Sequence, residues 1–490
     1  MSDELTKLTA AELAQLIGAR KVSPVEVMEA HLSRAGELNP RLNAIVTFAP
    51  DALERAREAE QLVMRGEASG ALHGVPVTVK DTIETAGLRT TSGSLLRANY
   101  IPPRDASSVR RLKRAGAIVF GKTNVSEMAL TYESDNLVFG RTNNPHDLSR
   151  TPGGSSGGEA AAVSACLSPF GLGSDLAGSI RIPAHFCGIM GLKPTAGLIP
   201  IDGHFPACEG AFALGASVGP MARSVNDLEL MFDALNTADE EDKDIIRFWE
   251  VDGRRTEWRS LKNVRVAWYA DDGVAPVTEE TRRAIEGAAR ALVEAGCVVV
   301  NERPPGVEQG FALWLKLFQG ATADYVRRVY RNRETEAGAA ARAVMRTNAE
   351  FRQSDYYSAM NERNHLLSAL VGWMRTTPLV VAPVGSVSAF EHGTRKVFID
   401  NGNEQTAPRG EAVNIFRAFS PSQAFNVFGL PVIVVPVLRD SGGLPVGVQL
   451  VGRPYDEKLL FRAARVVEEA FGGWQPPDAR ALSLNGDDEL

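Results

Sequence analysis

The sequence predicts an α/β protein, because segments patterned like helices alternate with short apolar segments that are typical of buried strands. The chain has 490 residues, of which 44% are hydrophobic and 23% charged, the composition of an ordinary globular protein. A chain of this length can bury a large core, and wide α/β sheets often form a single unit with insertions. We therefore expect one main body.

The N-terminal part begins with two marked helix starts. Thr9 and Glu12 form a capping box, and Ser23 and Glu26 form another that has a proline at the first helical position. Valines then alternate with other residues in LHGVPVTVKDT, which predicts a strand with Lys80 at its end. A helix closed by a glycine follows at 105–114, and AIVF after it predicts a short buried strand.

Residues 140–194 are rich in glycine, serine, alanine and proline, with one helical patch of small residues at 159–166. A flexible linker would not carry the apolar side chains that crowd the end of this segment, namely Ile180, Ile182, Phe186, Ile189, Met190 and Leu192. We expect a buried, tightly turned loop system here.

The second half continues the α/β pattern. Strands are predicted at VRVAWYA (264–270), CVVV, LVVAPV, PVIVVPV and GVQLVG, and helices after Thr278, over about 310–374 and from about Asp456. Residues 387–405, with Gly393 and the pair Asn401-Gly402, indicate an exposed hairpin or loop excursion.

Charge and targeting signals exclude several classes of protein. The net charge is −7 and no dense basic block occurs, so we expect neither nucleic acid nor a membrane surface as a partner. The N-terminus lacks the pattern of a secretion signal, and the longest apolar run, at 430–438, is about half of what crosses a bilayer. The four cysteines show no zinc-binding spacing. We expect a cytoplasmic protein without metal or cofactor.

Two motifs match chemical patterns only formally. GAIVFGKT (116–123) fits the phosphate loop, but the residues between its glycines are themselves strand-forming and cannot wrap a phosphate. GGSSG (153–157) fits the nucleophile elbow, but no apolar strand precedes it, and neither His365 nor His392 has a marked context. We reject both readings.

Lys80, the GGSSGG loop and GSDLAGSIRIP remain. A lysine whose pKa is lowered by burial can take the proton of a serine, although pairing of Lys80 with Asp81 is an equally good explanation. Consecutive backbone N–H groups that could bind an oxyanion come from the LAGS turn, which consists of Leu176, Ala177, Gly178 and Ser179. The alternative is a tight packed turn with Asp175 and Arg181 as a structural pair.

TPGGSSGGEAAAVSA followed by GLGSDLAGSIRIPAHFCGIMGLKPT resembles the amidase signature, and LHGVPVTVKDT resembles the lysine segment of the same family. The resemblance extends over nearly the whole chain through three further segments, GKTNVSEMA, GPMARSVNDL and NVFGLPVIVVPV. It implies a twisted mixed sheet sandwiched between helices, in a single domain over 1–490. Its expected parts are N-terminal helices at about 8–65, a signature core at about 70–235, a variable helical segment at about 305–420 and a return to the sheet at about 421–475.

The resemblance also implies roles for the site residues. Ser179 would be the acyl-enzyme nucleophile, Ser155, preceded by a cis peptide bond, the bridging serine, and Lys80 the general base. The amides of residues 176–179 would form the oxyanion hole. One departure is Ala177, where the family usually has glycine: its methyl group disfavours a positive φ, so the shape of the acyl pocket is in question.

Substrate choice is left open among aryl or aliphatic amides, oligoamides, carbamates and esters. We expect substrate contacts from Met128, Tyr132 and Gly154, and pocket walls from the loops 128–132 and 200–215 and the 310–420 segment. Aromatic residues that could line the pocket or equally belong to the core are Phe205, Phe212, Trp314, Phe318, Tyr325, Tyr356 and Tyr357.

The main hypothesis is therefore a stand-alone amide hydrolase of small molecules, with a homodimer left open. The alternative within the family is a glutamine-hydrolysing component of an amidotransferase. Against the alternative, GHFPACEGAFALGASVGP and the 310–420 segment look unlike that component. The third hypothesis is a non-catalytic descendant, which the filled Lys80, Ser155 and Ser179 positions disfavour.

Overall fold

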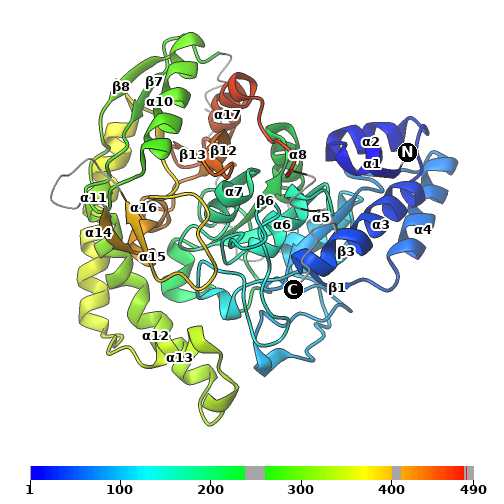
Figure 1. Cartoon of the computed structure of the whole chain (residues 1–490), viewed down its shortest axis with the longest axis horizontal. Coiled ribbons are helices and arrows are strands. Elements are labelled where there is room, and N and C mark those ends of the chain that lie inside the picture. The colour runs from blue at the N-terminus through cyan, green and yellow to red at the C-terminus, as the bar shows by residue number, and fades with distance from the viewer. Residues whose placement is uncertain (1, 238–259, 400–409, 479–481, 483–490) are drawn as a thin grey trace, which may run out of the picture.

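An eleven-stranded mixed sheet runs through the molecule (Figure 1). The structure is a computed structural model that describes residues 2–237, 260–399, 410–478 and 482. In sheet order the strands are β1 (Ile45–Phe48), β3 (Ile118–Thr123), β2 (Pro76–Lys80), β4 (Phe170–Asp175), β6 (Ser217–Ala222), β5 (Met190–Lys193), β12 (Val432–Arg439), β13 (Pro445–Gly452), β9 (Leu379–Pro383), β7 (Arg265–Trp268) and β8 (Val298–Asn301). β2 runs parallel to β3 and β4, and β7 runs parallel to β8 and β9, whereas the other pairs are antiparallel. The predicted α/β class and mixed sheet are confirmed.

The helices of the described residues flank this sheet. They are α1 (Ser2–Lys7), α2 (Ala10–Gly18), α3 (Pro24–Leu42), α4 (Ala52–Arg65), α5 (Ser107–Arg114), α6 (Gly157–Ser164), α7 (Arg181–Cys187), α8 (Val225–Leu235), α10 (Glu279–Glu294), α11 (Val307–Trp314), α12 (Gly320–Val329), α13 (Ala339–Met345), α14 (Gln353–Met374), α15 (Ile415–Ala418), α16 (Ser420–Val427) and α17 (Glu457–Phe471). Both predicted capping boxes start helices, at Thr9 for α2 and at Ser23 for α3.

Alternation along β12 separates the two faces of the sheet. Ile433 and Val435 belong to the largest apolar cluster, which includes side chains of α8, α10 and α17. Val434, which points to the opposite face, belongs to a second cluster built on α6 and α7. Helices therefore cover both faces, and the sheet lies between them.

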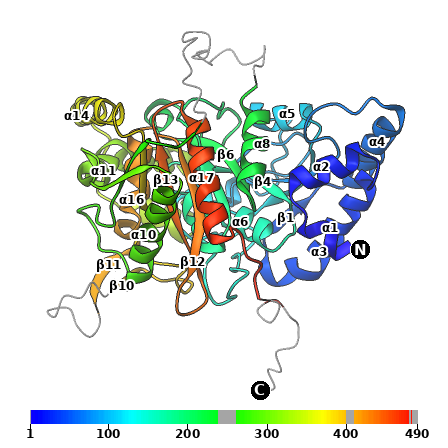
Figure 2. The same ribbon diagram turned by 90° about the horizontal axis from the view of Figure 1, so that it is seen from above.

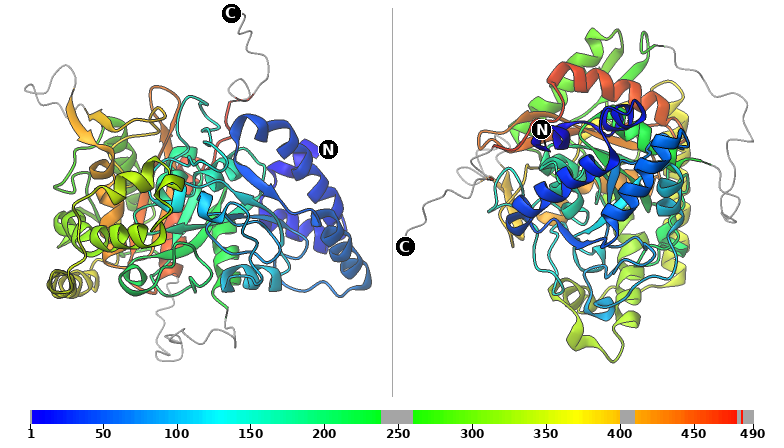
Figure 3. Two further views of the ribbon diagram at one scale, coloured as in Figure 1. Left: turned by 90° about the horizontal axis from the view of Figure 1, so that it is seen from below. Right: turned by 90° about the vertical axis from the view of Figure 1, so that its right-hand side faces the viewer.

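Different parts of the chain lie at the two ends of the sheet. In Figure 1, α1 to α4 lie at the end of the sheet that has β1 and β3, and Figures 1 and 2 show α11 and α14 at the opposite end. Figure 3 shows the same division from below, with α12 and α13 at the side away from the N-terminal helices. The stretch 8–65, expected to be helical, also contains the edge strand β1.

The segment 140–194 is buried as predicted, but its description as a loop system is wrong. It contains the strands β4 and β5 and the helices α6 and α7. β4 is not apparent from the sequence because it contains glycines, which do not favour strands. Glycine is needed at position 171 because a side chain there would collide with the carboxylate of Glu159, which lies over the strand.

Other expectations concern single segments. The phosphate-loop match lies in β3, as its strand-forming residues predicted. β10 (Lys396–Ile399) and β11 (Glu411–Asn414) pair as an antiparallel hairpin, and the Asn401-Gly402 turn lies outside the described residues. None of the described helices is both long and apolar enough to cross a membrane.

Candidate active site

Parallel pairing of β2 and β4 brings the expected catalytic residues together at the carboxyl ends of these two neighbouring strands. Lys80 is the last residue of β2, and β4 ends at Asp175 beside it. Ser179 follows β4 in the turn that leads to α7, and Ser155 lies in the loop before α6. The carboxyl ends of adjacent parallel strands are a usual place for a site in α/β proteins.

Lys80 is fully buried, and its side-chain nitrogen is held by two serines. Nζ lies 2.7 Å from Ser155 Oγ, 2.9 Å from Ser174 Oγ and 3.2 Å from the Ser174 carbonyl oxygen. Asp81 faces away and accepts the N–H of Thr91 at 2.9 Å. Of the two readings that the sequence left open, the Lys80–Asp81 pair is therefore not formed.

Burial sets the protonation of Lys80. Removal from water lowers its pKa to about 7, although the nearby Asp175 carboxylate partly offsets the shift. A substantial fraction of this amine is neutral near pH 7, whereas an exposed lysine would be almost fully charged. Lys80 can therefore accept a proton, as a general base must.

The loop that carries Ser155 is fixed from one side by a single hydroxyl. Ser134 Oγ donates to the carbonyls of Gly153 and Ser155, at 3.1 and 3.3 Å, and accepts the N–H of Gly157 at 2.9 Å. The Gly154–Ser155 peptide bond is cis, as the resemblance implied. No strand runs directly into this loop in the described chain, which agrees with the rejection of a nucleophile elbow.

Ser179 lies in the wall of a pocket that Ser155 also lines. It is 7% exposed, and its carbonyl accepts the Ser156 N–H at 3.2 Å, which ties the two serine-bearing loops together. Within the described residues the Ser155 and Ser179 hydroxyls share no hydrogen bond. Lys80 is therefore hydrogen-bonded to Ser155, and Ser179 lines the same pocket as Ser155, but the hydrogen bond between the two serine hydroxyls is not formed.

Asp175 organises the turn of residues 176–179. Its carboxylate accepts the N–H groups of Gly178 and Ile180 at 2.8 and 3.0 Å, and Arg181 binds it in a fully buried ion pair at 3.0 Å. Burial alone would raise the pKa of Asp175, but the Arg181 guanidinium and hydrogen bonds outweigh burial and hold this pKa below its usual range. Asp175 and Arg181 therefore form the predicted structural pair, and this pair holds the same turn that was predicted to offer N–H groups to an oxyanion.

The Gly178 amide is the exception among the four N–H groups expected in the oxyanion hole. Because it already donates to Asp175, it is not free for a substrate oxygen. The amides of Leu176, Ala177 and Ser179 have no acceptor among the described residues. Three donors, and not four, are available.

Two aromatic side chains fix the direction of these peptides. The Trp314 indole N–H donates to the Leu176 carbonyl at 3.0 Å, and the Tyr132 hydroxyl donates to the Ala177 carbonyl at 2.9 Å. In a trans peptide the carbonyl and the next N–H point in opposite directions, so the Trp314 bond orients the Ala177 amide. The positive φ of the turn falls on Gly178, at 103°, so Ala177 needs no unusual backbone geometry.

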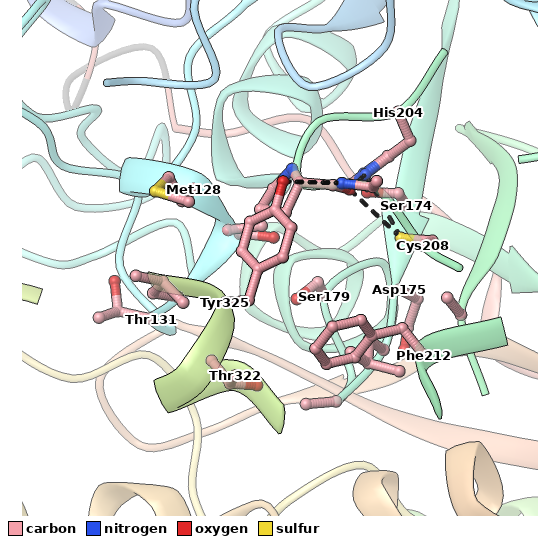
Figure 4. Close-up of a pocket in the computed structure, with 18 of the residues that line it drawn as sticks. Met128, Thr131, Ser174, Asp175, Ser179, His204, Cys208, Phe212, Thr322 and Tyr325 are labelled. Atoms are coloured by element: carbon pink, nitrogen blue, oxygen red, sulfur yellow. Dashed lines mark hydrogen bonds between the residues drawn. The ribbon is translucent and has the colours of Figure 1, made fainter. Parts of the chain in front are cut away.

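The pocket beside these residues is mostly apolar (Figure 4). It is lined by Met128, Ala129, Leu130, Thr131, Tyr132, Ser155, Ser174, Asp175, Leu176, Ala177, Ser179, Ile201, His204, Pro206, Ala207, Cys208, Phe212, Ala216, Trp314, Thr322, Tyr325, Val326 and Phe416. All three expected wall segments, 128–132, 200–215 and 310–420, contribute to it.

Some residues expected at the pocket lie elsewhere. Gly154 is not part of the lining, because its α-carbon faces the backbone of residues 131–133. Phe205, Phe318 and Tyr356 pack in apolar clusters and Tyr357 is exposed. The residues that line the pocket as expected are Met128, Tyr132, Phe212, Trp314 and Tyr325.

Sequence reasoning missed the polar residues behind Lys80. Ser174 lies in the GSD motif, but no pattern marked it as a partner of the lysine. His204 comes from the 200–215 loop, and its Nε2 lies 2.9 Å from Ser174 Oγ. A lone histidine in a loop carries no local signal, and only the fold brings it to the site.

Fold and site define an enzyme class: a hydrolase that breaks carbon–nitrogen amide bonds, of the kind in which a Ser-Ser-Lys triad is typical. The chain belongs to the Amidase family, whose model matches residues 26–461. It is 31% identical to a glutamyl-tRNA(Gln) amidotransferase subunit from Caldanaerobacter subterraneus subsp. tengcongensis, over 99% of this chain and 100% of that one. It is 33% identical to the corresponding protein from Carboxydothermus hydrogenoformans, over 95% and 98%.

Solved structures agree with this family. The substrate complex of 6-aminohexanoate cyclic dimer hydrolase superposes with a TM-score of 0.83 at 27% identity, covering 98% of this chain and 100% of that one. The corresponding glutamyl-tRNA(Gln) amidotransferase subunit from Thermotoga maritima gives a TM-score of 0.74 at 26% identity, over 96% and 98%.

Proposed function

We propose that the chain hydrolyses a linear, uncharged amide through an acyl-enzyme on Ser179. Neutral Lys80 takes the proton of Ser155 while Ser155 takes that of Ser179, and Ser179 Oγ bonds to the amide carbonyl carbon. The proton returns along the same path to the leaving nitrogen, the C–N bond breaks and the amine departs. Water then attacks the ester in the same way and releases the acid. The observation that carries this proposal is the 2.7 Å contact between buried Lys80 and Ser155.

The open link between Ser155 and Ser179 is consistent with this mechanism. Hydrogen bonds of catalytic groups are often long or misaligned without substrate and tighten in the complex. The hydrogen bond from the Ser156 N–H to the Ser179 carbonyl already holds the two serine-bearing loops together, and we expect the Ser155–Ser179 bridge to form when substrate binds. The negative charge of the tetrahedral intermediate is stabilised by the free amides of Leu176, Ala177 and Ser179.

The pocket supports an uncharged substrate with an apolar or aromatic acyl part. Phe212, Trp314, Tyr325 and Phe416 line it, whereas the single carboxylate in its wall, Asp175, is already paired with Arg181. A free amino acid would bury a carboxylate and an ammonium here without a partner, which is costly. Esters of the same acids should react too, since their leaving group is better.

The second candidate is a glutamine-hydrolysing component of an amidotransferase, and the sequence relatives support it better than they support a stand-alone enzyme. The relatives described above are amidotransferase subunits that match over nearly the full chain. In that case the same Lys80, Ser155 and Ser179 would release ammonia from glutamine, and the chain would act with partner proteins. The apolar pocket lining weighs against it.

The test is a hydrolysis screen of the purified chain alone. We expect release of p-nitroaniline from anilides of aliphatic and aromatic acids, with kcat/KM at least about 100-fold above that for release of ammonia from glutamine. Matched esters and glutamine-derived anilides separate the effect of the acyl charge from that of the leaving group. Ammonia release from glutamine combined with inert anilides would reject the first candidate and favour the second.

A further inference from the structure

A second hydrogen-bond chain leaves Lys80 on the side away from Ser155. Ser174 Oγ lies 2.9 Å from Lys80 Nζ and 2.9 Å from His204 Nε2, and His204 Nδ1 lies 2.7 Å from the Pro206 carbonyl oxygen. Figure 4 shows His204 beside Ser174 and Cys208 at the pocket wall. The chain therefore connects the buried lysine to a loop far from it in sequence.

The Pro206 carbonyl determines the tautomer of His204. A carbonyl oxygen can only accept, so Nδ1 must carry the proton, and the neutral ring then offers a lone pair at Nε2. The Cys208 thiol lies 3.4 Å from Nδ1 but also 3.6 Å from the Pro206 oxygen, which can accept its S–H. Burial lowers the pKa of His204 to about 4, a shift to which Lys80 and Lys122 add, so the ring is neutral near pH 7.

The polarity of the remaining bonds follows from this tautomer. Ser174 has one hydroxyl proton and must donate it to His204 Nε2, so towards Lys80 its oxygen can only accept. The two N–H groups of a neutral lysine amine then go to Ser174 Oγ and to the Ser174 carbonyl oxygen. The amine is tetrahedral, so its lone pair is left for the third neighbour, Ser155 Oγ, at 2.7 Å.

We propose that His204 is a positioning residue, which acts through Ser174 to aim the lone pair of Lys80 at Ser155. The inference rests on the proposed function, in which Lys80 is the general base. Without an acceptor at position 204, the Ser174 hydroxyl can rotate and donate its proton to the lone pair of Lys80. The lysine would then be neutral but occupied, and Ser155 would lose its base.

The arrangement also fits the protonated state. An ammonium has three N–H groups, and Ser155 Oγ, Ser174 Oγ and the Ser174 carbonyl are three acceptors around it. The same chain can therefore hold Lys80 before and after proton transfer without reorganisation. His204 keeps its acceptor role in both states, because the Ser174 proton does not move.

The test compares substitutions of His204 in the full chain with the best anilide from the screen. His204→Leu removes the acceptor and should lower kcat about tenfold while KM stays within about twofold. His204→Gln places an amide oxygen near the position of Nε2 and should recover most of kcat. His204→Asn reaches only as far as Nδ1 and should behave like the leucine variant. His365→Leu, at an exposed position of α14, is the control and should match the wild type.

A double-mutant cycle with Ser174→Ala tests whether His204 acts through Ser174. In the Ser174→Ala background, His204→Leu should cost nothing further. Fully additive losses, a loss confined to KM, or unchanged kcat in both His204→Leu and His204→Asn would each overturn the proposal. If His204→Leu does not fold, the comparison of the glutamine and asparagine variants decides the question.

Failure of this inference and failure of the proposed function give different results. If Ser179→Ala and Lys80→Met are inactive while the His204 variants keep full kcat, His204 has no positioning role and the mechanism stands. If Ser179→Ala or Lys80→Met retains activity, the mechanism itself is wrong.

Discussion

Replacing Ser179 by alanine should lower kcat for amide hydrolysis by about 10⁴-fold or more, because no acyl-enzyme can form without its hydroxyl. The substitution removes one oxygen from a side chain whose hydroxyl makes no hydrogen bond within the described residues. The fold should therefore be retained. Single-turnover and steady-state assays with the anilide measure the loss.

Ser134→Ala is the matched control for loss of a buried serine hydroxyl near the site. Its hydroxyl orients the Ser155 loop, so we expect only a partial loss, on the order of tenfold. Thermal melting of both variants separates a chemical defect from unfolding. Turnover by a folded Ser179→Ala protein within tenfold of the wild type would remove Ser179 as the nucleophile.

Replacing Lys80 by methionine should lower kcat by about 10³-fold or more, because the site loses its general base. Methionine has a similar length and no charge, so it suits a fully buried position. Lys80→Arg should be inactive too, since a guanidinium is not deprotonated in proteins. Rates of hydrolysis of one anilide, measured with all variants, test this expectation.

Lys193→Met is the control for Lys80→Met. Lys193 is also fully buried with a pKa lowered by burial to about 7, but it donates to the Pro194 carbonyl and not to a serine of the pocket. Its replacement should leave kcat within about threefold. Equal losses from the two substitutions would show that burial of a lysine, and not proton transfer by Lys80, is what matters.

The same base fixes the sign of the pH dependence. The active form of Lys80 is neutral, and its pKa is about 7, so kcat/KM should rise with pH below 7 and level off about one unit above it. Below pH 6 the slope should approach tenfold per unit. A rate that falls as pH rises from 6 to 8 would contradict the role of Lys80.

Local features of the fold could be predicted from the sequence. The capping boxes at Thr9 and Ser23 depend on residues three positions apart, and both helices begin there. Lys80 was predicted at a buried strand end because the alternation of valines identifies both the strand and its last residue. Such patterns need no knowledge of the rest of the chain.

Features that depend on which groups meet in three dimensions could not be predicted. β4 could not be recognised because position 171 is a glycine, which does not favour a strand. That glycine is required by the Glu159 side chain packed over it. The Gly178 amide was expected in the oxyanion hole, although Asp175 holds it, because spacing alone does not show which N–H groups are already bonded. His204 reaches Ser174 from 30 residues further along the chain. Trp314 was expected only as a pocket or core aromatic, and its hydrogen bond to the Leu176 carbonyl, 138 residues away, was not predicted.

The central claim is that Ser179 forms the covalent intermediate, and labelling with a fluorophosphonate tests it most directly. The reagent phosphonylates an activated serine, and peptide mass mapping then locates the adduct. We predict one adduct on the peptide that carries Ser179, none in the Ser179→Ala protein, and strongly slowed labelling of Lys80→Met. An adduct on Ser155, with Ser179 unmodified, would contradict the account.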